Sequence, residues 1–185
     1  MASDSLQLWN VIGTWLASIG TISAVITSLW LANRQGKIHL GIVAGHRQLA
    51  TRGSKDVPDL CMIKIVNTGT RPAKITGIGW ECGRFKKKIH LIQLFGTPDS
   101  DNIPKTLQEG EEGVFLVPFI LDNSDKDWIV SLPKTLTKHT DNGINSLKVC
   151  VSTSVGQSFK VKVEKGLKDK LYESLKANKK INKDT

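Results

Sequence analysis

The stretch GTWLASIGTISAVITSLWLA, residues 13–32, lies near the start of a chain that is otherwise rich in lysine. It belongs to a longer run, Ser5–Asn33, in which no residue carries a charge. Such a run exceeds the roughly 20 apolar residues that a helix needs to cross the hydrocarbon core of a bilayer. It predicts a transmembrane helix over about residues 8–32. Six Ser and Thr residues and Asn10 within residues 9–31 keep a second reading open, a helix buried in a soluble core.

Tryptophans and charges at the two ends of this segment predict its placement. Trp9 and Trp30 are separated by about 31 Å of helix, close to the thickness of the apolar slab, and tryptophan prefers the two membrane interfaces. Arg34 and Lys37 follow directly, and all 26 Lys and Arg residues of the chain lie at or after Arg34. The positive-inside rule therefore predicts an outside amino terminus and a cytoplasmic carboxyl-terminal side. A secretory signal is not expected, because the apolar stretch is too long and no positive region precedes it.

A stripe of small residues runs along the predicted helix. Its members recur at spacings of 4, 3, 4 and 3, which places them on one side: Gly13, Ala17, Gly20, Ala24 and Thr27. Because lipid gives helices no hydrophobic reason to associate, close packing across small residues is how they usually do so. The stripe predicts a homo-oligomer formed through the helix. The alternative is that small residues are common in membrane spans.

The remaining chain, about 150 residues, is long enough for one domain with its own core. Residues 60–67, 146–154 and 158–165 alternate apolar and polar residues, as half-buried strands do, whereas residues 114–121 are apolar on both faces. Turn residues separate these runs, and Gly156 suits a hairpin between the last two. Seven or so short strands predict an antiparallel sandwich or a small barrel. We expect three parts: 1–36 with the membrane helix, a mainly β domain over 37–165, and a basic amphipathic helix with its tail over 166–185.

Cys61, Trp80 and Cys150 stand in the order of an immunoglobulin core with its disulfide between sheets. Alternation argues against that bridge. With Lys64 and Lys148 pointing outward, Cys61 faces the core together with Ile63 and Ile65, but Cys150 points out. Reduced thiols agree with a cytosolic location. Trp80 is expected in the core, and Gly77 and Gly79 before it favour a bulged strand.

Three segments carry a resemblance to a known group of proteins: residues 67–80, NTGTRPAKITGIGW; residues 103–115, IPKTLQEGEEGVF; and residues 151–171, VSTSVGQSFKVKVEKGLKDKL. With the opening helix, they make the chain similar to a broad group of uncharacterised bacterial single-pass membrane proteins. The resemblance implies an amino-terminal span in the inner (cell) membrane and a cytoplasmic immunoglobulin-like β-sandwich. It implies no catalytic motif. Some small proteins of this layout resemble membrane effectors of anti-phage systems.

Searching for chemistry in the sequence yields no enzyme motif. The four histidines, His39, His46, His90 and His139, form no HExxH pair and lie at no metal-ligand spacing from a cysteine. No phosphate-binding glycine loop and no GxSxG elbow is present. Three glutamates in LQEGEEG, residues 107–113, read best as a solvated turn. We therefore expect a non-enzymatic protein with no metal and no cofactor.

Basic residues dominate two segments, RFKKK at 84–88 and the amphipathic stretch 165–183 with Leu167, Leu171 and Leu175 on one face. A cytoplasmic domain next to an anionic leaflet gains about 1 kcal/mol per nearby Lys or Arg. We expect membrane-surface contact from Arg34, Lys37, Arg84, Lys86, Lys87, Lys88, Lys168 and Lys170. A merely solvated basic surface remains the alternative. Nucleic acid is disfavoured, because only Phe85 and Tyr172 interrupt these segments with an aromatic ring.

Two functions fit the sequence. The first is a membrane-anchored interaction module that presents its β-domain to a cytoplasmic protein partner and self-associates through its helix in the bilayer. The second is a membrane-acting effector or toxin, for example in anti-phage defence, whose β-domain senses a ligand and whose clustered helices perturb the bilayer.

Overall fold

The computed structural model of the protein describes residues 2–35, 37–50, 57–83, 88–95, 100–121, 127–139 and 143–181. The chain divides into two compact units, Met1–Lys37 and Ile38–Thr185. The first unit is a single helix and the second is a β-rich domain.

Helix α1 (Ala2–Gln35) holds a segment, Trp9–Ala32, that is long and apolar enough to cross a membrane. None of that segment is buried against the rest of the protein. Its polarity is largely satisfied within the helix, because four hydroxyls each donate to the carbonyl oxygen four residues earlier at 2.8–2.9 Å: those of Thr14, Ser18, Thr21 and Thr27. Such internal bonds let a Ser- and Thr-containing helix lie in an apolar medium without exposing unpaired donors.

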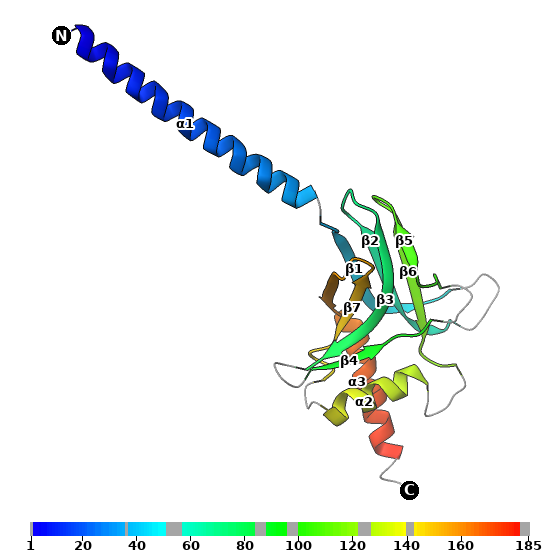
Figure 1. Ribbon diagram of the computed structural model, residues 1–185. Coiled ribbons are helices and arrows are strands. Elements are labelled where there is room, and N and C mark those ends of the chain that lie inside the picture. The colour runs from blue at the N-terminus through cyan, green and yellow to red at the C-terminus, as the bar shows by residue number, and fades with distance from the viewer. Residues whose placement is uncertain are drawn as a thin grey trace. The chain divides into compact units, whose positions relative to one another are not determined.

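Two antiparallel sheets form the domain (Figure 1). The first has the order β1-β2-β6, from β1 (Leu40–Gln48), β2 (Asp59–Asn67) and β6 (Glu112–Pro118). The second has the order β4-β3-β7-β8, from β4 (Ile89–Ile92), β3 (Ala73–Cys82), β7 (Lys148–Thr153) and β8 (Ser158–Lys162). The short β5 (Lys105–Leu107) pairs with the start of β3.

One buried cluster joins the inward-facing residues of both sheets. Trp80 is 2% exposed, and Cys61, Ile63 and Ile65 are fully buried. Alternation on β7 buries Val149 and Val151 and leaves Cys150 half-buried on the outer side of its sheet. The three cysteines are free, as the alternation predicts.

Local sequence signals account for several connections. Strands β7 and β8 form the predicted hairpin, with Gly156 at a φ of 78°, a conformation that glycine adopts without strain. The register of β3 against β7 shifts between Ile75 and Gly77, where the glycines favour a bulge.

Two helices complete the domain. Helix α3 (Lys165–Ile181) begins directly after β8, and its Leu167 and Leu171 are fully buried in the shared core. The carboxyl-terminal helix is therefore part of the β-domain rather than a separate tail. Helix α2 (Trp128–His139) packs beside it, and the Ser174 hydroxyl donates to the Ile129 carbonyl at 2.8 Å. The sequence analysis did not predict α2, which holds Pro133 and has no acidic residue in its first turn.

The domain has two ends, which we call the entry end and the far end. At the entry end, where the chain arrives, the Thr68 amide donates to the His39 carbonyl and the turn of residues 67–72 leads into β3. At the far end lie the last residues of β3 and both domain helices (Figure 1). Lys88 lies there too, because the next residue, Ile89, pairs with Cys82. Strand β3 runs from one end to the other, so its ten residues separate them by about 30 Å.

Candidate functional site

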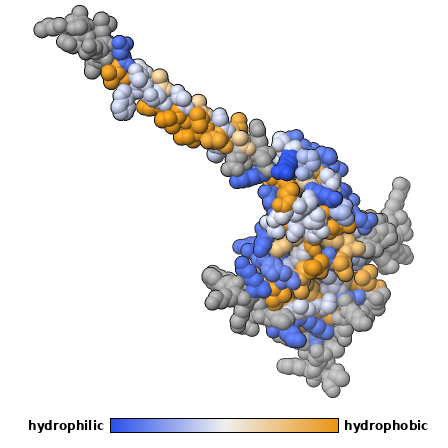
Figure 2. Space-filling model, in the orientation of Figure 1, coloured by the Kyte–Doolittle hydropathy of each residue, from blue (hydrophilic) through white to orange (hydrophobic). Residues whose placement is uncertain are grey.

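Exposed apolar side chains run along the described part of α1, with less hydrophobic residues between them (Figure 2). Trp9, Trp15, Leu16 and Leu29 are each more than 60% exposed. The five residues of the small-residue stripe, Gly13, Ala17, Gly20, Ala24 and Thr27, are exposed as well. A Cβ atom added at Gly13 or Gly20 would meet nothing within 4 Å, so no part of the described chain covers the stripe there.

The basic residues expected at the membrane surface separate into two groups. Lys37 is exposed and is the last residue of the unit that holds α1. Lys88 is exposed at the far end, where Lys168 and Lys170 are only half-exposed on α3. The described part of the chain does not include Arg84, Lys86, Lys87 or the side chain of Arg34. Within the domain, Lys88 therefore lies at the opposite end of β3 from the entry end.

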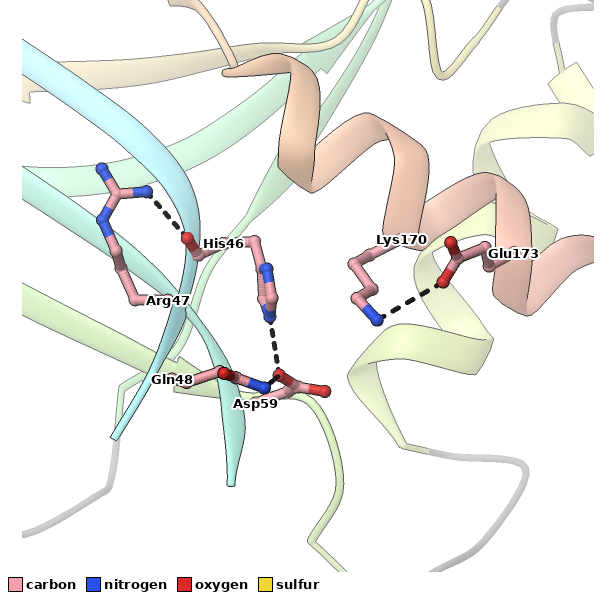
Figure 3. Close-up of polar contacts among 6 residues, drawn as sticks. All are labelled: His46, Arg47, Gln48, Asp59, Lys170 and Glu173. Carbon is pink, nitrogen blue, oxygen red and sulfur yellow. Dashed lines mark hydrogen bonds and ion pairs between the residues drawn. The ribbon is translucent and has the colours of Figure 1, made fainter. Parts of the chain in front are cut away.

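A polar cluster joins β1 to β2, and Lys170 of α3 lies beside it (Figure 3). His46 Nε2 lies 2.7 Å from Asp59 Oδ1, and Gln48 donates to the same oxygen at 3.0 Å. Lys170 extends from α3 beside this pair and bonds Glu173 at 3.4 Å. The hydrogen bond from His46, with further help from Gln48 and the Lys170 charge, holds the pKa of Asp59 below its usual value.

Behind His46 a row of aromatic rings enters the core. His46 stacks on Phe119 at 5.4 Å between ring centroids, and Phe119 stacks on Trp128 at 5.5 Å. Trp128 then meets Trp80 at 5.6 Å. The Gln93 side-chain oxygen accepts from both indole nitrogens, that of Trp80 at 2.9 Å and that of Trp128 at 3.0 Å. This row ties the first sheet, α2 and the second sheet together.

A second polar cluster surrounds Glu81 on the outer face of the second sheet. Glu81 is a buried carboxylate, 3% exposed, that pairs with Lys160 and lies 3.5 Å from His90 Nδ1. The hydrogen bond from Lys160 is the largest cause that holds the pKa of Glu81 below its usual value. The same bond raises the pKa of Lys160. Both groups are therefore charged at neutral pH.

These clusters hold ion pairs and show no activated nucleophile. His46 points Nε2 at a carboxylate and stacks its ring on Phe119, and among the described residues no hydroxyl or thiol hydrogen-bonds to it. Burial raises the pKa of each cysteine thiol, which disfavours the reactive thiolate. Within the same described ranges, no three His, Cys, Asp or Glu side chains are grouped so as to hold a metal ion.

Comparison with known proteins gives no family. No protein-family model matches the chain, and no curated protein matches it. The X-ray structure of Northeast Structural Genomics Consortium target SoR45 aligns with 70% of this chain and 84% of its own, at 11% identity and a TM-score of 0.30. Similarity at that level adds nothing to the account of the fold.

Sequence reasoning missed three features of the domain: the His46–Asp59 pair, the buried Glu81 and the apolar edge of β4. Each depends on strand pairing between segments distant in the chain. One local signal existed for the third, since IHLIQL, residues 89–94, reads as a strand whose apolar residues fall on both faces.

Proposed function

We propose that this protein is a membrane-anchored, non-enzymatic interaction module, held in a bacterial inner membrane by α1 and presenting its domain to a protein partner in the cytoplasm. One observation carries the proposal. The apolar segment Trp9–Ala32 is wholly exposed, while the domain completes its core from residues after Lys37 alone. An apolar helix that the domain does not bury requires another apolar environment, and its length matches a bilayer. Arg34 and Lys37 on its carboxyl-terminal side favour the cytoplasmic placement of the domain.

An immunoglobulin-like sandwich is our proposal for the domain. The order of strands in each sheet supports this proposal. Order β1-β2-β6 corresponds to strands A-B-E of the immunoglobulin arrangement, and order β4-β3-β7-β8 corresponds to strands C′-C-F-G. Trp80 on β3 then occupies the position of the buried tryptophan on strand C. Domains of this architecture serve many unrelated functions, so the fold itself names no partner.

Self-association through α1 is the second part of the proposal. The stripe from Gly13 to Thr27 lets two helices approach closely. Asn10 continues the stripe at its amino-terminal end, seven residues before Ala17, and its amide can hydrogen-bond across a helix pair.

Leaflet contact is proposed first for Arg34 and Lys37, which adjoin the helix. Lys88, Lys168 and Lys170 reach the headgroups only if the domain lies on its side, since the leaflet potential decays over about 10 Å.

Carbonate extraction of membranes tests the anchor. The full-length chain is expected to stay in the pellet, and a reporter at its carboxyl terminus should be active only in the cytoplasm. Affinity capture of the full-length protein from membranes then reports its copy number and partners. Release into the carbonate supernatant would contradict the proposal, as would a carboxyl terminus outside the cell.

The second candidate function, a membrane effector, is favoured by the hydroxyls on and beside the stripe. One side of α1 is more polar than is usual for a simple anchor, because it carries the hydroxyls of Thr14, Thr21, Thr27 and Ser28. Entry of a membrane-impermeant dye after expression tests this candidate. An intact barrier at full expression leaves the interaction module as the function.

A further inference from the structure

The two sheets have edges at β1, β6 and β8 and, on one side of β3, at β4 and the short β5; those of β1, β6 and β8 carry features that hinder pairing. The edge of β6 is covered by Ser100 and Asp101, whose side chains accept from the Leu116 amide at 3.1 Å and the Val114 amide at 2.7 Å. The edge of β1 receives a hydrogen bond from the Glu164 amide to the Ala44 carbonyl at 2.9 Å. Strand β8 alternates Lys160 and Lys162, and charged side chains on an edge oppose pairing with another chain.

Strand β4 is the longer of the two strands on that side of β3, and no residue that the structure describes pairs with its outward backbone groups. The Gln93 amide donates to the Ile78 carbonyl at 2.9 Å, so residue 93 belongs to a hydrogen-bonded pair with β3. Because such pairs alternate along an antiparallel ladder, the N–H and C=O groups of His90 and Ile92 point away from β3. No hydrogen bond to these groups comes from any residue that the structure describes.

The side chains along this edge are apolar and exposed. Ile92 is 85% exposed and Leu94 is 84% exposed, the two highest values among the large apolar residues described in the domain. Beside them, Gly77 and Gly79 of β3 carry no side chain that would project from the sheet. Gly79 is required there, since a Cβ atom would lie 2.2 Å from the Leu91 carbonyl oxygen. An extended partner can therefore approach both the backbone and the apolar side chains.

The charged residues around one end of β4 indicate which side chains a partner would need there. On this end of the outer face, the described residues of β3, β4, β7 and β8 and the adjoining Lys88 carry one carboxylate, that of Glu81, and four lysines: Lys88, Lys148, Lys160 and Lys162. Glu81 is already paired with Lys160 and is buried, so the accessible charge there is positive. A partner with acidic side chains at this end complements it, whereas a lysine-rich segment, including a second copy of β8, is repelled.

We infer that β4 is the edge at which the partner protein adds an extended segment as a further strand, with apolar residues at alternate positions against Ile92 and Leu94 and an acidic residue against Lys88 and His90. This inference rests on the proposed interaction function and names its surface. Strand addition of this kind takes affinity from main-chain hydrogen bonds and specificity from alternate side chains.

Selection from a random peptide display library against the full-length protein in lipid nanodiscs tests the inference. Enriched peptides are expected to alternate apolar residues and to carry an acidic residue at one end. Ile92→Lys should weaken their binding by about tenfold or more, the effect of losing one buried aliphatic contact. The matched control is Val155→Lys, which places the same charge at an exposed apolar residue of the β7–β8 hairpin and should leave binding unchanged. Thermal unfolding of both variants checks that each folds.

Hydrogen exchange provides a readout specific to strand addition. A synthetic copy of an enriched peptide should slow exchange at the amides of His90 and Ile92. The inference is overturned if no peptide is enriched, if the enriched peptides lack the pattern, or if Ile92→Lys leaves their binding intact. If the Ile92→Lys protein still captures a native partner from membranes, β4 is not the binding edge, but the proposed interaction function still holds.

Discussion

Gln93 supplies the hydrogen-bond acceptor for the indole N–H groups of two tryptophans in different elements. Its side-chain oxygen accepts from Trp80 on β3 and Trp128 on α2. Gln93→Leu leaves both indole N–H groups without this acceptor, and the site is half-buried. We expect the free energy of unfolding to fall by about 1–2 kcal/mol, measured by urea denaturation of the full-length protein in detergent. Gln93→Glu retains an acceptor oxygen and should lose less. Equal losses in the two variants would assign the effect to packing instead.

The Glu81 carboxylate makes the domain sensitive to acid. Lys160 holds its pKa below the ordinary value of 4.5, so the unfolded chain binds a proton at higher pH than the folded one. The stabilisation is therefore fully present above about pH 4.5 and is lost as the pH falls from there through the lowered pKa. Glu81→Gln should be less stable at pH 7 and should show a shallower loss of stability in acid. Urea midpoints measured across this range report both effects. Glu109→Gln, at an exposed turn, is the control and should keep the wild-type acid profile.

Among the elements, α1 carries the prediction for self-association. Leucine at Gly13, Ala17, Gly20 and Ala24 fills the stripe and holds neighbouring helices apart, so cross-linking of full-length protein in membranes should fall to the level of a monomer. The control replaces Ser18, a small residue away from the stripe, with leucine and should keep the cross-linked species. Loss of cross-linking in both variants would show that general hydrophobicity, not the stripe, governs association. The same stripe variant should abolish any dye entry if the helices perturb the bilayer.

Helix α3 is predicted to be essential for the domain. Leu171 is fully buried in the shared core, so Leu171→Ala should cost about 2–5 kcal/mol of unfolding free energy. Lys176→Ala on the exposed side of the helix should stay within about 0.5 kcal/mol of the parent. Urea denaturation compares them. Similar stabilities for the two variants would mean that α3 is an appended tail, as the sequence analysis divided it.

At the scale of the whole molecule, the proposed anchor predicts that the entry end of the domain lies nearer to the lipid than the far end. A fluorophore on a cysteine at Thr70, at the entry end, should be quenched strongly by a quencher attached to lipid headgroups. The same fluorophore at Lys88 should be quenched weakly, because about 30 Å separates the two ends. Strong quenching at Lys88 would instead support a domain that lies on its side with Lys88, Lys168 and Lys170 at the leaflet. Quenching in nanodiscs made with anionic and with neutral lipid separates charge attraction from tethering.

Sequence alone determined the features of this protein that depend on near neighbours in the chain. These features follow from local periodicity and turn chemistry, which each segment carries by itself. They are the apolar run around residues 13–32, the alternation in β2, β7 and β8, the hairpin at Gly156, and the opposite orientation of Cys61 and Cys150. The tertiary structure alone decided the features that join distant segments. Helix α2 lacks a strong local signal and packs against α3, and the buried Glu81 meets Lys160 from a strand that lies far away in the sequence. The open edge at Ile92 likewise exists because strand order left β4 outermost, and strand order is set by the shared core rather than by any short stretch of residues.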